Sequence, residues 1–244
     1  SALGWGQVAH VTSVVGHSPP IGPRAFGSEA TAAVDRLRRS ATRLGVESLA
    51  IVQRTRLIAI IGGTEDAVGV VRELADCFAD GPIVVGPTVP HLFAAGRSAR
   101  AALSGLVAAA AWSDAPRVVT ADELLPERAL AGDQPARRAL IERTHRRLSE
   151  PNQVQLLETA QRYLDVGGSL ETTARALFIH TNTVRYRLGR ISDITTYDLA
   201  TPREAWTVRI GLALGRLTAA EQAPPRHHSV LQLEETSKRS PTTS

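Results

Sequence analysis

The sequence predicts an α+β protein in which a ferredoxin-like α/β sandwich is followed by an all-α helix-turn-helix domain. Strand-like and helix-like segments alternate over the first half in the order β, α, ββ, α, β, α, β, which is typical of helices packed on one sheet. From about residue 153 onward, only helical periodicity is found. Within that part, residues 170–191 have the pattern of two helices joined by a tight turn.

The composition is that of a globular protein with one large or two small domains. The chain has 244 residues, 43% of them hydrophobic, and its net charge of +4 is compatible with nucleic acid without being diagnostic. The single cysteine, Cys77, excludes an internal disulfide framework, fits a reducing cytoplasm and is expected to be a small buried hydrophobe. No segment approaches the ~20 apolar residues of a membrane span, and none resembles a signal peptide, so we expect a cytoplasmic protein. The lack of Met predicts a fragment or processed chain with a further upstream domain.

Each element of the first domain, residues 1–125, has its own signal. Gly45 is expected to end the first helix, and Thr64 to cap the second, whose first turn is acidic. Two β-rich runs around the polar connector 53–56 predict a hairpin. The expected strands are 5–15, 48–52, 57–61, 81–87 and 117–120, and the expected helices are 29–44, 65–78 and 91–112.

The second half begins with residues 126–152, which we interpret as a basic helical connector. Its prolines and dense charge predict a helix over 135–148, whose arginines are expected to form a solvated face rather than a phosphate-binding support. A four-helix DNA-binding domain is expected over 153–217, beginning with a helix over 153–165 that ends at Gly167 and Gly168. Thr201, Pro202 and Glu204 predict the start of the last helix, which is expected to bury Trp206, Ile210, Ala213, Leu214 and Leu217. Residues 218–244 are expected to be a disordered tail, and His227 and His228 are not assigned a metal.

Residues 170–191 carry the strongest functional pattern. Ser169 is expected to cap the first helix, where Leu170, Ala174 and Leu177 share one face. Val184, Leu188 and Ile191 share one face of the second helix, over about 181–191.

The opposite face of this second helix is predicted to bind DNA. Asn can pair with adenine, Arg with guanine or phosphate, and Tyr with phosphate or a thymine methyl, while Gly allows close approach of the backbone. The predicted DNA-binding residues are Thr181, Asn182, Thr183, Arg185, Tyr186, Gly189 and Arg190, of which Thr183 and Arg190 lie on the flank and suit phosphates. Two residues are expected to support them: His180 as a hydrogen-bonding turn residue, and Arg187 at the edge of the core.

The run TARALFIHTNTVRYRLGRI resembles the C-terminal helix-turn-helix of the PucR/CdaR family of bacterial transcriptional regulators. Its matching residues are Ala174, Leu177, His180, Asn182, Thr183, Arg185, Tyr186, Arg187 and Leu188. Three positions depart from the family: Thr181 replaces Arg, while Thr196 and Phe178 replace Gly. The order of elements before it is similar to the GGDEF-like domain of CdaR-type regulators, so that the combined resemblance covers about residues 28–217.

This resemblance implies a catalytically inactive regulator that binds double-stranded DNA and has no cofactor. It further implies control of fatty-acid and mycolic-acid synthesis genes, with a long-chain acyl-CoA as effector, although the sequence itself reveals no acyl or CoA pocket. Residues 151–217 hold eight Arg and no Lys against six Asp and Glu, a net +2, which is modest for one DNA-binding unit. We therefore expect a homodimer or higher homo-oligomer, with the Ala-rich helix over 94–112 and the connector as candidate contact surfaces. Packing against the chain's own sheet explains the alanines equally well.

Two other functions are considered. A diguanylate cyclase carries Gly-Gly-acid-acid in its central hairpin turn, whereas Gln53–Arg56 has neither glycine nor acid. The similar run Gly62–Asp66 follows the hairpin, where a capped strand-to-helix turn is favoured over a phosphate site. A nucleotide-binding sensor or degenerate cyclase, and a protein-interaction module, are the alternatives, and no catalytic or metal-binding residue is assigned.

Overall fold

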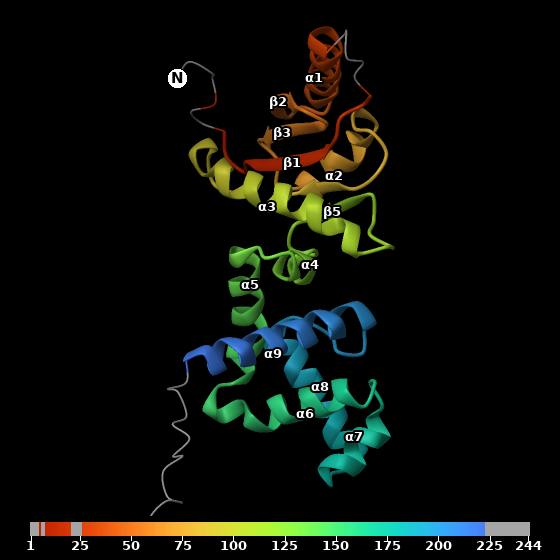
Figure 1. Ribbon diagram of the computed structural model, residues 1–244, viewed down its shortest axis with the longest axis vertical. Coiled ribbons are helices and arrows are strands. Elements are labelled where there is room, and N and C mark those ends of the chain that lie inside the picture. Colours follow the sequence, from red (N-terminus) through yellow and green to blue (C-terminus); the bar gives the residue numbers. More distant parts are fainter. Residues whose placement is uncertain (1–4, 6–7, 21–25, 223–244) are drawn as a thin grey trace, which may run out of the picture.

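The structure, a computed structural model, describes residues 5, 8–20 and 26–222, and its first part is built on one five-stranded sheet (Figure 1). The strands are β1 (Thr12–His17), β2 (Glu47–Gln53), β3 (Arg56–Gly62), β4 (Ile83–Val85) and β5 (Val118–Thr120). Their order in the sheet is β2-β3-β1-β4-β5, with three antiparallel pairs and a parallel β4–β5 pair. The first four strands have the ferredoxin-like arrangement, so the predicted α+β class is confirmed.

Helices cover both faces of this sheet. They are α1 (Phe26–Arg43), α2 (Ala67–Glu73) and α3 (Ala95–Ala108). Successive strand residues point to opposite faces, so Val14 packs in one core with Leu37 of α1 and Val71 of α2. Its neighbour Val15 packs on the other face with Ala102 and Leu106 of α3. The alanines of α3 are therefore buried against the chain's own sheet.

Two expectations for this domain need correction. The first strand begins at Thr12 rather than residue 5, and Trp5 instead packs beside Val11 in a small separate cluster. The cap of α2 is Asp66 rather than Thr64, because its carboxylate accepts the N–H of Gly69 at 2.8 Å. Thr64 accepts the N–H of Asp66, so the helix begins two residues later than predicted. Cys77 is buried, as expected.

The second part of the chain is helical. Its elements are α4 (Leu125–Leu130), α5 (Gln134–Ile141), α6 (Val154–Asp165), α7 (Leu170–Leu177), α8 (Thr181–Thr195) and α9 (Pro202–Gln222), with a π-helical turn over Glu142–Arg146. In Figure 1, α4 and α5 lie between the sheet and the other helices, and α7 lies at the end of the molecule remote from the sheet.

The segment 126–152 is mostly helical, and several of its apolar residues pack into the fold. Leu140 and Leu148 are fully buried, and Leu140 packs with Ile210 and Leu214 of α9. Several arginines are tied to other elements: Arg128 is buried against Asp133, and Arg143 pairs with Asp122 at 2.8 Å. Among the arginines expected on a solvated face, Arg138, Arg146 and Arg147 are exposed, while Arg143 ties the segment to Asp122.

The last helix is buried on more sides than its sequence indicates. Thr207, Val208, Gly211, Leu212 and Gly215 are buried, whereas Leu217, an expected core residue, is 56% exposed. Glu204 accepts the N–H of Asp198, three residues before the expected Thr201 cap. The helix also continues to Gln222, so the tail cannot begin at residue 218, and residues 223–244 lie outside the described part.

Candidate nucleic-acid interface

The helix pair α7–α8 is defined by caps on both sides of its turn. Ser169 caps α7 by accepting the N–H of Thr172 at 3.2 Å, as predicted. Phe178 takes the left-handed conformation at φ 55°, and the next residue, Ile179, donates its N–H to Ala174 O at 3.0 Å. His180 then caps α8, since its Nδ1 accepts the N–H of Asn182 at 3.1 Å. The turn therefore keeps a glycine-type geometry although position 178 is Phe.

The two faces of α8 differ as the periodicity predicts. Val184 and Ile191 are fully buried, and Leu188 is half-buried against the same core. The exposed residues among those predicted to bind DNA are Asn182, Arg185, Tyr186, Gly189 and Arg190, while Thr181 and Thr183 are half-buried. α8 extends to Thr195, four residues beyond the expected end, and Thr196 then adopts φ 66°. That left-handed residue stands where related sequences commonly have Gly.

The exposed side chains of α8 are already paired with one another. Arg185 donates from Nη1 to Asn182 Oδ1 at 2.8 Å, so the two groups best suited to base edges are held together. Arg190 pairs with Asp193 at 3.2 Å, which screens part of its charge. Tyr186 is 68% exposed, so its ring and hydroxyl are accessible to another molecule.

Arg187 has a different role from Arg185. It reaches α6, donating from Nη1 to Thr159 Oγ1 at 3.1 Å and from Nη2 to Gln155 Oε1 at 2.7 Å. The structure thus places it at the edge of the core.

We expect Arg187→Ala to lower the free energy of unfolding by about 1–2 kcal/mol, because two hydrogen bonds from a charged group to α6 are lost. Arg185→Ala removes only a contact on the solvent side, so its stability should match that of the wild type within about 0.5 kcal/mol. Urea unfolding of both variants measures the difference, and equal stability would contradict the orientation of α8.

An arginine clamp that the sequence does not reveal joins α9 to α4 and to Trp112. Arg203 of α9 forms a two-point ion pair with Glu127 of α4, whose side chain is 1% exposed. Its Nη2 also donates to Glu123 O at 2.7 Å. The guanidinium carbon lies 3.8 Å from the ring centroid of Trp112 and 5.1 Å from that of Trp206. Arg147 adds a second tie, donating to Ile194 O in the last turn of α8 at 2.7 Å.

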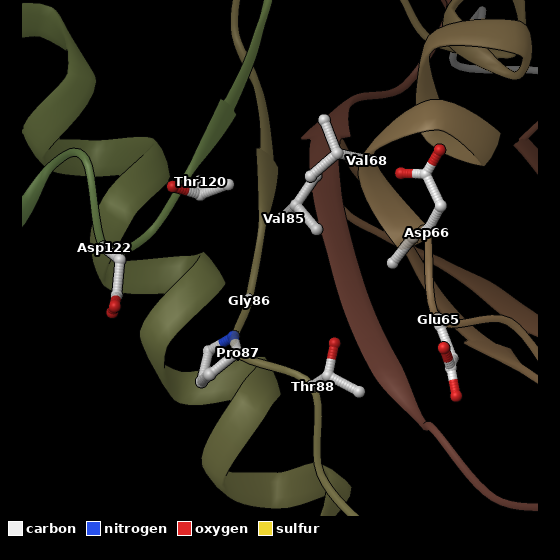
Figure 2. Close-up of a pocket in the computed structure, with 10 residues that line it drawn as sticks. Glu65, Asp66, Val68, Val85, Gly86, Pro87, Thr88, Thr120 and Asp122 are labelled. Carbon is white, nitrogen blue, oxygen red and sulfur yellow. The ribbon is translucent and has the colours of Figure 1, made fainter.

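Figure 2 shows a cleft at the start of α2 that bears on the nucleotide alternative. Its volume is about 340 Å³, and it is bordered by Glu65 and Asp66 on one side and by Thr120 and Asp122 on the other. Three carboxylates repel a phosphate, and Asp66 already occupies the helix start as its cap. The run Gly62–Asp66 is therefore a capped strand-to-helix turn.

The central hairpin turn also differs from a cyclase. β2 and β3 pair up to Gln53 and Arg56, leaving Arg54 and Thr55 as the turn residues. No glycine or acid is present there to admit a nucleotide or bind a metal. Within the described residues, no group of three or more metal-binding side chains is found.

Other clefts lie at the helix pair and at the junction of the domains. One of about 560 Å³ borders the turn and includes Ala174, Phe178 and Ile179. Another, of about 350 Å³, lies beside Trp112, Arg143, Tyr197 and Arg203. Both are open to solvent, so neither is the apolar tunnel that would hold a long acyl chain.

Of the helices that the structure describes, none combines the length and apolar character needed to cross a membrane.

Comparison with known proteins identifies two family patterns in this chain. The PucR C-terminal helix-turn-helix domain matches residues 156–214, and the GGDEF-like domain matches residues 1–108. A solved structure, the regulator of polyketide synthase expression from Bifidobacterium adolescentis, is 30% identical, with a TM-score of 0.73. The alignment covers 88% of this chain and 84% of that one.

Two further proteins are similar to this chain, one over most of its length and the other over a short part. An uncharacterised protein of Mycobacterium tuberculosis (strain H37Rv) is 44% identical over 220 residues, which is 89% of this chain and 53% of that protein. The DNA-binding transcriptional activator AdeR of Bacillus subtilis is 33% identical over 63 residues, covering 26% of this chain and 15% of AdeR. The chain thus spans about half the length of the mycobacterial relative.

Proposed function

This chain belongs to the PucR-type regulators that join a GGDEF-like domain to a C-terminal helix-turn-helix, and from this premise we propose that it is a cytoplasmic, sequence-specific DNA-binding regulator. In this proposal, residues 153–217 bind the major groove through α8, and residues 1–125 form a domain without catalytic activity. The observation that carries it is the exposed face of α8, where Asn182, Arg185 and Tyr186 project from a helix whose other face is buried. Gly189 lies on the same face and allows close approach of the backbone, while Thr183 and Arg190 lie on its flank and suit phosphates. Thr181, at the start of α8, completes the proposed set.

Asn182→Ala and Tyr186→Ala should each weaken operator binding by about 1–3 kcal/mol, since each removes a side chain available to a base or phosphate. Neither side chain is buried, so both variants should fold. A gel shift with DNA upstream of the gene measures the loss, and Asn152→Ala, an exposed asparagine before α6, is the matched control. Wild-type affinity in both variants would refute the assignment of this face to DNA, whereas the absence of any shift by the wild type would favour the protein-interaction alternative.

We further propose that the regulator acts as a homodimer. The net +2 of residues 151–217 supplies few phosphate contacts, and two-fold operators match two-fold proteins. Control of fatty-acid and mycolic-acid synthesis genes, with a long-chain acyl-CoA as effector, stays a prediction from the resemblance. A similar solved structure is a regulator of polyketide synthase expression from Bifidobacterium. Polyketide synthases and fatty-acid synthases both extend acyl thioesters, so the predicted target genes are of a related chemical class.

A further inference from the structure

The two edges of the sheet are unequal. β5 offers three residues at one edge, whereas β2 offers seven, Glu47–Gln53, at the other. Natural edge strands are usually short or carry Lys, Pro or a bulge, which prevents pairing with other chains. The central residues of β2, Ser48–Val52, have no charge and no proline, and Ile51 is 61% exposed. Within the described residues, no strand pairs with the outer side of β2.

The hairpin determines which backbone groups point outward. Gln53 and Arg56 close a two-residue turn, and such a closing pair exchanges both of its hydrogen bonds. Because hydrogen-bonded and non-bonded pairs alternate, Ile51 and Leu49 also bond to β3. The N–H and C=O groups of Ser48, Ala50 and Val52 therefore point to the free edge.

The charges at the ends of β2 select one way of pairing. Glu47 is exposed at the start of the strand, and Arg54 is exposed just after its end. If a second β2 adds antiparallel about Ala50, Leu49 faces the partner's Ile51 and Glu47 faces the partner's Gln53, which places Glu47 one residue from the partner's Arg54. Parallel addition would place like charges together. The outward groups at Ser48, Ala50 and Val52 would form about six hydrogen bonds in this register.

We propose that β2 is the surface on which a second copy of this chain adds, about a two-fold axis at Ala50, to give one continuous sheet of ten strands, five from each copy. The inference rests on the proposed homodimer and names its contact surface. We propose the β2 edge in place of the two contact surfaces expected from the sequence, which were the Ala-rich helix and the basic connector. The alanines of α3 pack on the chain's own sheet, and the segment 126–152 packs against α9.

Reversing the charges tests the register in the full chain. Sedimentation equilibrium should find the wild type dimeric, while Glu47→Arg and Arg54→Glu each weaken the dimer about tenfold, because each places two like charges across the axis. The double variant should regain dimerisation. Glu73→Arg, an exposed acid on α2, is the control and should leave the dimer unchanged.

A disulfide provides a second, independent readout. Across the proposed axis, the two Ala50 Cα atoms are about 5.5 Å apart, which a disulfide can span. Ala50→Cys should therefore give a covalent dimer on mild oxidation, while the wild type, whose Cys77 is buried, should not.

Three results would overturn the inference: a monomeric wild type, single variants that dimerise as the wild type does, or a double variant that stays monomeric. The gel shift separates this from the proposed function. Specific DNA binding by a monomer would remove the proposed homodimer and its β2 surface but keep the DNA-binding function, whereas a β2 dimer without specific binding would remove the DNA-binding function and keep the surface.

Discussion

Arg203→Ala should be among the most destabilising single changes in this chain, lowering the free energy of unfolding by about 3–5 kcal/mol. Glu127 is 1% exposed, so without the guanidinium its carboxylate stays buried with no cation beside it. The stacking on Trp112 and the bond to Glu123 O are lost in the same variant. Since these groups belong to three different segments, one substitution loosens the whole junction.

Urea unfolding followed by circular dichroism measures this effect. Arg216→Ala, which removes an exposed arginine from the same helix, is the control and should change stability by no more than about 0.5 kcal/mol. Arg203→Met combined with Glu127→Leu should recover most of the loss, because no charge is then left buried. If Arg203→Ala were as stable as Arg216→Ala, the clamp would not hold the junction.

Gly211→Ala should destabilise the helical domain by about 1–3 kcal/mol through overpacking. A methyl group at this position overlaps the hydroxyl of Thr144 in the π-helical turn. Thr144 cannot move aside, because it is fully buried and donates to Leu140 O at 2.7 Å. One turn later, Gly215 meets His145 in the same way, and burial, with the nearby charge of Arg216, lowers the pKa of that histidine.

Gly189→Ala is the matched control for this prediction. It makes the same change within a helix, but nothing lies within 4 Å of the added methyl group. Helix propensity alone should then stabilise the protein by up to about 1 kcal/mol. Thermal unfolding of the two variants should show shifts of opposite sign, and a stabilised Gly211→Ala variant would contradict the close packing of α9 on the π-helical turn.

The helix-turn-helix is the part of the fold that the sequence predicts best. The ends of α7 are found at the expected residues, because Ser169 at one end and the left-handed turn at the other are local signals. The inner and outer faces of α8 follow for the same reason, since one face packs on a single core. The prediction for α2 missed the cap because Thr64 and Asp66 are both good capping residues, and only the geometry shows which one bonds Gly69.

The predictions fail where an element is buried on more than one side. α9 lies between the core around Val208 and Leu212 and the segment over 134–148, so its apolar positions follow no single stripe. Leu217 belongs to the expected stripe and yet faces solvent. The clamp was missed because Arg203 and Glu127 are separated by 76 positions, and a surface arginine has the same local pattern as one that pairs across the junction.

The central claim, that the exposed face of α8 reads bases, is tested most directly by titrating wild-type, Asn182→Ala and Arg190→Ala proteins against an operator and its single-base-pair variants at several salt concentrations. We expect Asn182→Ala to lose about 1–3 kcal/mol and its preference at one base pair, while Arg190→Ala weakens binding to all sequences alike and lowers the salt slope by about one. If Asn182→Ala kept both the affinity and the full base preference of the wild type, α8 would not be the reading element.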